Sequence, residues 1–202
     1  MKRITAERIE ATEGLPDSAE WNKSESLSFC ADWQGLNPDP QRTTEATMLW
    51  SPDHLFIRFR CQYRELYTYE RGNSLRDELW LRDVAELFIR PEDDSPKHYK
   101  EFEISPNGNW LDLDINNEKK TFLSCNLKSL VTMNSPKMIW TAEIGIPFSC
   151  LDASFDPRKI WRLNLFRIEG SEPNRFYSAW RPTGAPKPNF HVPEVFGELH
   201  LK

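Results

Sequence analysis

The sequence lacks several features that would assign it to a large class of proteins. No apolar run approaches the roughly 18 residues of a membrane-spanning helix. The net charge is −5 and the basic residues are scattered, so no basic stripe is available for nucleic acid. The opening MKRITAERIE contains no apolar segment of a secretory signal. We therefore expect no membrane span, no nucleic-acid partner and a cytoplasmic protein; removal of a signal ahead of this chain would instead make it secreted or periplasmic.

Cysteine is sparse, with four residues at Cys30, Cys61, Cys125 and Cys150. They are widely spaced and form no CxxC pair, which argues against a zinc site. Each lies among apolar neighbours. We therefore expect small buried hydrophobic side chains. Disulfide pairing is the alternative that this spacing leaves open.

Helical periodicity is also scarce, and only residues 65–71 and 128–132 suggest short turns. Short apolar segments separated by Pro, Gly and polar residues are typical of strands instead. The expected strands are residues 44–50, 55–61, 83–90, 99–104, 110–115, 138–146, 161–168, 176–180 and 195–201. Many short strands indicate an all-β fold, an antiparallel β-sandwich of jelly-roll or immunoglobulin-like architecture.

The length of the chain suits a single domain over residues 1–202 with a substantial core. The 8 Trp and 12 Phe supply much of the bulk that such a core needs. Residues 1–20 are polar, and we expect them to form a peripheral arm. Residues 169–174 and 181–193 read as long loops, which is where binding residues tend to lie on a rigid sandwich.

Residues 77–91, DELWLRDVAELFIRP, carry the most information. Ala85, Leu87 and Ile89 alternate with polar and larger residues, which predicts a strand with two different faces. The apolar face belongs in a core. Opposite it stands Glu86, a carboxylate that folding does not require, and Trp80 lies close by in sequence. A flat aromatic beside a carboxylate suits the stacking and hydrogen bonding of a sugar ring.

The same alternation sorts residues of the neighbouring strands by face. Phe102 and Ile104 should point into the core in one strand, and Leu163 and Leu165 in another. If these strands adjoin, the opposite face presents the polar side chains of Glu86, Glu101, Glu103, Arg162 and Asn164. This set offers the donors and acceptors that sugar hydroxyls need. A solvated sheet face with cross-strand ion pairs is the other interpretation of the same pattern.

The tryptophans divide by sequence context. Trp50, Trp140 and Trp161 end or flank apolar strands and are expected in the core. Trp80 lies among acidic and basic residues, and Trp180 lies between a strand end and the loop RPTGAPKPN. An aromatic in a polar setting is either half-buried packing or a platform for a ligand.

From about residue 44 onward the chain resembles the family 9 carbohydrate-binding modules, in their stand-alone branch within the DOMON-like β-sandwiches. The matching segments are LWLRDVAELFIRP, YKEFEISPNGNWLDLDI, WTAEIGIPFSCL, WRLNLFRIEG, FYSAW and NFHVPEVFGELHL. The spacing Trp80-x-x-Asp83-x-x-Glu86 together with the terminal FHxPxxFGxLxL carries the resemblance.

The resemblance implies a β-sandwich that binds sugars, in the best-known members the reducing ends of glucan and xylan chains. Two Trp side chains clamp the ring in that family. By position, Trp80 resembles the first clamp residue, Trp180 the second, and Glu86 the acceptor of ring hydroxyls. The chain departs from the family pattern at Ala85, where members carry a basic residue, and at residues 106–109, where they carry an Arg. No cofactor is implied as required; structural calcium occurs in some members.

We therefore expect a non-catalytic domain that binds mono- or oligosaccharides or polysaccharide ends. One alternative is a glycoside hydrolase, or an accessory domain in carbohydrate catabolism, because paired carboxylates about 5.5–9.5 Å apart cleave glycosidic bonds. Its candidate acids are Glu86, Glu101, Glu103, Asp112 and Asp114. Another alternative is a DOMON-like haem module, which needs axial Met or His ligands. Its candidates are Met48, Met133, Met138, His54, His98, His191 and His200.

Overall fold

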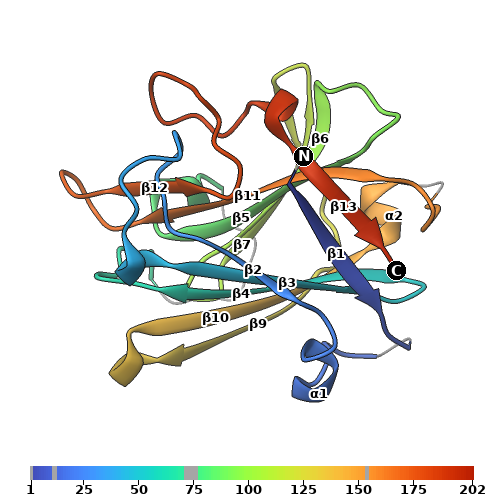
Figure 1. The fold of residues 1–202 in the computed structure, drawn as a ribbon, viewed down its shortest axis with the longest axis horizontal. Coiled ribbons are helices and arrows are strands. Elements are labelled where there is room, and N and C mark those ends of the chain that lie inside the picture. Colours follow the sequence, from blue (N-terminus) through green and yellow to red (C-terminus); the bar gives the residue numbers. More distant parts are fainter. Residues whose placement is uncertain (1, 11–12, 71–76, 153–154) are drawn as a thin grey trace.

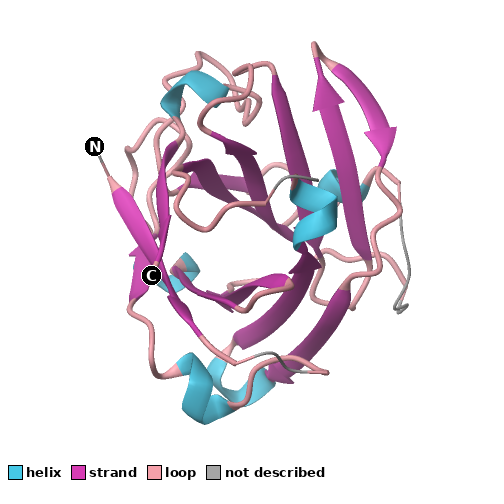
Figure 2. Ribbon diagram, turned by 90° about the vertical axis from the view of Figure 1, so that its right-hand side faces the viewer, coloured by secondary structure: helices cyan, strands magenta, loops and turns pink. Residues whose placement is uncertain are grey.

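The computed structural model describes residues 2–10, 13–70, 77–152 and 155–202. Strands dominate these ranges and helices are confined to single turns (Figure 2). The helices are α1 (Ser18–Trp21) and α2 (Phe148–Leu151). The strands are β1 (Arg3–Arg8), β2 (Ser26–Phe29), β3 (Thr44–Trp50), β4 (His54–Gln62), β5 (Val84–Pro91), β6 (His98–Ile104), β7 (Trp110–Asn116), β8 (Lys119–Phe122), β9 (Lys128–Asn134), β10 (Ile139–Pro147), β11 (Trp161–Glu169), β12 (Phe176–Ala179) and β13 (Gly197–Leu201).

The strands form one curled sheet that folds into two layers. Its order is β8-β7-β6-β5-β11-β13-β1-β3-β4-β10-β9, with β12 beside β11 and β2 beside β3. Figure 1 shows β5, β7, β11 and β12 above β2, β3, β4, β9 and β10, with β1 and β13 crossing at one side. We call the layer that contains β5, β6 and β11 the upper layer and the one that contains β3, β4 and β10 the lower layer. The predicted all-β sandwich is confirmed.

Strand β1 corrects the expectation that residues 1–20 form a peripheral arm. Its first four residues pair in parallel with β13, and its last two residues pair in parallel with β3. It therefore joins the two layers. Ile4 and Ala6 are buried in the core between them. The pattern RITAER hides this strand, because only two buried apolar residues alternate with charged ones.

Two apolar cores result from the strand alternation. The larger core lies between the layers and contains Ala85, Leu87 and Ile89 of β5 facing Ile57 and Phe59 of β4. The second core lies on the other face of the upper layer, under loop residues such as Phe190 and Phe196. The outer face of the upper layer is therefore covered, and it is not the solvated face that the sequence allowed.

Strands β3 and β4, both expected from the sequence, form a hairpin in which Trp50 lies opposite Leu55. Two other local expectations fail. Residues 128–132, expected as a turn, belong to strand β9, which pairs with β10. Residues 65–70 are irregular, and residue 71, the end of the other expected turn, lies outside the described residues.

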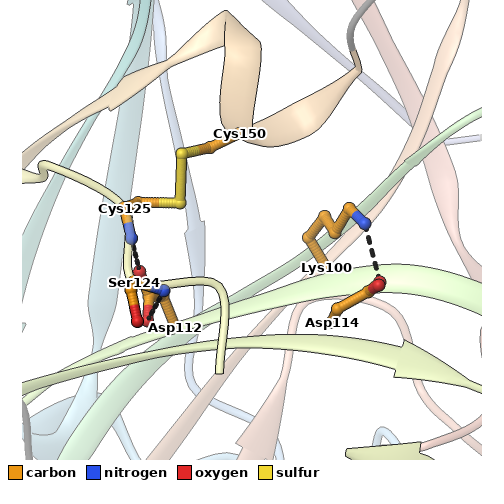
Figure 3. Close-up of a disulfide and its surroundings, with 6 residues drawn as sticks. All are labelled: Lys100, Asp112, Asp114, Ser124, Cys125 and Cys150. Carbon is orange, nitrogen blue, oxygen red and sulfur yellow. Dashed lines mark hydrogen bonds and ion pairs between the residues drawn. A yellow bond between two sulfur atoms is a disulfide. The ribbon is translucent and has the colours of Figure 1, made fainter. Parts of the chain in front are cut away.

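A disulfide joins Cys125 to Cys150, which corrects the expectation that all four cysteines are free buried side chains. Cys30 and Cys61 carry free thiols. Cys125 lies in the segment that crosses from β8 in the upper layer to β9 in the lower, and Cys150 lies in α2 (Figure 3). The Asp112 carboxylate of β7 accepts hydrogen bonds from the main-chain N–H groups of Ser124 and Cys125. The crossover is thus fixed to both layers.

Candidate ligand-binding cleft

A cleft of about 220 Å³ opens on the outer face of the upper layer. Its floor comes from β5, β6 and β11, and one wall is the loop segment of residues 188–191. This wall belongs to residues 181–193, which the sequence predicts as a long loop. The aromatic lining is Trp80, Phe88, Tyr177, Phe190 and His191, and the polar lining is Glu86, Glu101, Lys120, Arg175 and Asn189.

Trp80 is placed at the mouth of the cleft by a single 3-10 turn, Leu79–Leu81. Leu79 is fully buried and anchors this turn in the second core. The Arg175 guanidinium donates hydrogen bonds to the main-chain carbonyls of Trp80 and Leu81. Trp80 itself is only partly buried, and the Lys120 ammonium lies 4.4 Å from the centre of its ring. The indole is therefore held in place at the cleft, with the exposed Lys120 ammonium over its ring.

Glu86 and Glu101 form the acidic part of the floor. Each is only 2% exposed, although both line the cleft. Burial, followed by the charge of Glu101, raises the pKa of Glu86 well above the ordinary glutamate value, while Lys120 and Arg175 offset part of this effect. Glu103 stands directly across the ladder from Glu86, is completely buried and does not line the cleft.

Trp180 does not face Trp80, which corrects the expected two-tryptophan clamp. Tyr177 and Ala179 of β12 point into the second core, so the alternation sends Trp180 to the opposite side of the layer. There it is 5% exposed and packs in the core between the layers. A Cβ at Gly197 would lie 2.6 Å from its ring, so glycine at that position makes room for the indole. Tyr177 is the residue of this segment that reaches the cleft.

Arg162 and Asn164 share the sheet face with Glu86 but lie outside the cleft. Arg162 pairs with Glu92 and Glu198. Asn164 is completely buried, and its amide donates to the Arg181 carbonyl at 2.9 Å and accepts from the Arg181 N–H at 2.9 Å. Both residues hold neighbouring segments in place. The structure thus brings together Trp80, Glu86 and Glu101, with Glu103 behind them.

The candidate acids of the hydrolase alternative divide in the same way. The Asp112 carboxylate accepts hydrogen bonds from the crossover segment, and Asp114 pairs with Lys100 at 2.6 Å (Figure 3). Asp114 also lies 2.9 Å from His98. Neither lines the cleft. Of the acids named from the sequence, only Glu86 and Glu101 do.

Of the His and Met residues named for a haem ligand, only His191 reaches the cleft. Its Nδ1 lies 2.8 Å from the Tyr99 hydroxyl, and its ring lies 5.2 Å from that of Phe88. Burial lowers the pKa of His191, so the ring is neutral around pH 7. Met48 is buried between the layers, and Met133 and Met138 are exposed on the lower layer. His191 therefore serves to position the loop wall.

The sequence did not reveal Lys120, Arg175, Tyr177 and Asn189 as cleft residues. Lys120 belongs to the short strand β8, which was not predicted. Tyr177 had a usable signal, because it alternates with Trp180 along one strand and only one of the two can face the cleft. Arg175 and Asn189 lie in loops, where no periodicity indicates direction.

Three solved structures share this fold over the whole chain. One is from Bacteroides uniformis, described as a candidate carbohydrate-binding protein, with a TM-score of 0.80, 18% identity and 99% of its length covered. Two are family 9 carbohydrate-binding modules from Caldicellulosiruptor kristjanssonii, in complex with cellotriose (TM-score 0.67, 14% identity, 94% covered) and with glucose (0.63, 16%, 96%). The chain has the family 9 fold. At these identities the likeness extends to the fold alone.

Comparison with known protein sequences finds distant relatives. An "Extracellular protein" of Arthroderma benhamiae is 24% identical over 89% of this chain and 86% of its own length. The UPF0462 protein C4orf33 homolog of Rattus norvegicus is 29% identical, and the match covers 59% of each chain. The human UPF0462 protein C4orf33 is 28% identical over 62% of each. No protein-family model matches the chain. Within the described residues, each helix is too short or too polar to cross a bilayer.

Proposed function

We propose that this chain is a non-catalytic carbohydrate-binding domain and that the cleft at Trp80 holds the sugar. The observation that carries the proposal is the convergence of a fixed, partly exposed indole with two carboxylates at one cleft floor. The apolar C–H face of a pyranose can stack on the indole, while its edge hydroxyls need polar partners. A cleft lined by aromatics with a few convergent polar groups is the usual form of a small-molecule site.

The polar lining supplies both kinds of hydrogen-bond partner. The carboxyl oxygens of Glu86 and Glu101 can accept hydrogen bonds from sugar hydroxyls. Lys120, Arg175 and Asn189 donate. Lys120 is exposed on β8, so it can leave the Trp80 ring when a sugar takes that position.

The size of the cleft favours one ring at its centre. Its volume of about 220 Å³ is below the roughly 300–1,000 Å³ of most ligand pockets. A second hollow of about 450 Å³ adjoins it and shares Lys120, Asn189 and His191. Further sugar units of an oligosaccharide or chain end would follow this route. The ligands of the two family 9 modules, glucose and cellotriose, are of this class.

Titration calorimetry against glucose, cellobiose, xylobiose and cello-oligosaccharides tests the proposal. Trp80→Ala should weaken binding about 30-fold, the equivalent of about 2 kcal/mol for a central aromatic contact. Leu130→Ala is the control, because Leu130 is exposed on β9 of the lower layer and its loss should leave affinity unchanged. Absence of binding at millimolar sugar, or unchanged affinity in Trp80→Ala, would refute the proposal.

The pair Glu86 and Glu101 keeps glycoside hydrolysis as a second candidate. One oxygen of each lies within 4.8 Å of the other, which is close to the carboxyl spacing of about 5–5.5 Å in retaining enzymes. The raised pKa of Glu86 would suit a general acid. Release of reducing sugar from xylan or cellulose, abolished by Glu101→Gln, would establish this activity in place of simple binding.

A further inference from the structure

Three glutamates meet on β5 and β6 beneath the cleft. Glu86 and Glu103 are directly opposed across the ladder, and Glu101 follows on the same face of β6. One carboxylate oxygen from each lies within 4.8 Å of the other two. Their exposed fractions are 2% for Glu86, 2% for Glu101 and 0% for Glu103.

The surroundings offset the negative charge of this cluster only in part, through Lys120 and Arg175. Like charges placed opposite each other destabilise a sheet, and a buried carboxylate without partners costs several kcal/mol. Glu86 Oε1, Glu101 Oε2 and both oxygens of Glu103 have no hydrogen-bond partner among the described groups. The nearest cations are occupied elsewhere, since Lys120 lies over the Trp80 ring and Arg175 donates to main-chain carbonyls.

We propose that Glu86, Glu101 and Glu103 form a binding site for one divalent cation that prefers oxygen ligands, with Ca²⁺ as the best match. Ca²⁺ binds carboxylate oxygens at about 2.3–2.6 Å, so two oxygens on one ion lie at most about 5 Å apart. The 4.8 Å limit of the cluster satisfies this condition. Glu103 is completely buried, one of its oxygens lies in the cluster, and neither oxygen has an N–H or O–H partner. The group beside it is a second carboxyl, that of Glu101, so the pair needs either a shared proton or a cation.

The open side of the site faces the cleft, because Glu86 and Glu101 line it. Water can complete the coordination from that side, as Ca²⁺ takes about 6–8 oxygen ligands. The inference does not depend on sugar binding, since the carboxylates, and not the aromatic wall, carry it. Retention of protons by the cluster is the competing way to remove its charge.

Thermal unfolding of the chelator-treated chain tests the site. At about 100 times the dissociation constant, CaCl2 should raise Tm by roughly 5–10 °C, whereas NaCl of equal ionic strength should not. Calorimetry should give one ion per chain, with proton release as the carboxyls ionise. Glu103→Gln should abolish the Tm shift. Glu143→Gln should keep it, because Glu143 is a half-buried strand glutamate of the lower layer.

The wild-type chain decides the matter even if Glu103→Gln fails to fold. Tb³⁺, a luminescent substitute for Ca²⁺, should be sensitised by the nearby Trp80 and displaced by Ca²⁺. If neither ion binds at pH 7 and infrared spectra show protonated carboxyls, protons occupy the cluster and the proposal is wrong. Sugar titrations with and without chelator keep this result separate from that of the sugar proposal.

Discussion

Glu86 of β5 and Glu103 of β6 lie directly opposite each other across the two strands. In an exposed sheet, residues of opposite charge at such a position would form an ion pair. Burial and then the neighbouring carboxylate charges raise the pKa of both well above the ordinary glutamate value. Without a cation, the folded state therefore keeps protons that the unfolded chain releases above about pH 4.3. The free energy of unfolding therefore falls as the pH rises from about 4.3 toward the folded-state pKa values of these glutamates.

Replacing Glu103 by Gln should accordingly stabilise the chelator-treated protein at pH 7. The gain should be about 1.4 kcal/mol for each pH unit between the folded and unfolded pKa values, and it should shrink toward pH 4. Urea unfolding between pH 4 and pH 8 measures it. Equal destabilisation by Glu103→Gln at both ends of this range would contradict the description of the cluster.

For Trp180 we expect an effect on stability and not on sugar affinity, because its side chain packs in the core between the layers. Trp180→Phe should lower the free energy of unfolding by about 1–3 kcal/mol through the space it leaves in the core. Sugar affinity of the folded fraction should stay within a factor of about two of wild type. A loss of affinity as large as that of Trp80→Ala, with stability unchanged, would restore the two-tryptophan clamp.

At the scale of elements, the alternation of apolar and polar residues predicted the buried faces of some strands and missed one strand entirely. It assigned the faces of β5, β6 and β11 correctly, because their apolar residues fill the core between the layers. It could not show that loops cover the opposite face, since that depends on contacts distant in sequence. For the same reason β1 was missed, because its parallel partners lie at the far end of the chain and in β3.

The disulfide could not be predicted from the sequence either. Cys125 and Cys150 are 25 residues apart, and their meeting depends on how the crossover packs against α2. The site residues show the same division. Trp80 and Glu86, which the sequence named, line the cleft. Trp180, which the sequence also named, packs in the core between the layers, and Tyr177 lines the cleft instead.

Removing the disulfide should weaken the fold measurably. Closing a loop of this length is worth about 3 kcal/mol, so Cys125→Ser with Cys150→Ser should lower Tm by roughly 6–12 °C. Cys30→Ser, at a free and only partly buried thiol, is the control. Thiol titration of the unfolded, unreduced chain should find two reactive thiols; four would contradict the pairing. We propose from this bond that the chain works in an oxidising compartment.

At the scale of the whole molecule, the core between the two layers and the loops over the upper layer have different roles. The inter-layer core and the disulfide hold the scaffold, while the loops over the upper layer convert a sheet face into a cleft. Residues from β5, β6, β8 and the loops therefore line one cleft although they are far apart in the chain. A rigid scaffold with binding side chains on its covering loops is the usual division of labour in such sandwiches.

We propose that the sugar binds in the cleft at Trp80 and not between Trp80 and Trp180. Nuclear magnetic resonance of the 8 indole N–H groups during titration with cellobiose tests it most directly. We expect the Trp80 signal and the main-chain signals of residues 175–177 and 188–191 to shift with sugar concentration, while the Trp180 signal stays in place. A shift of the Trp180 signal with that of Trp80 unmoved would contradict it.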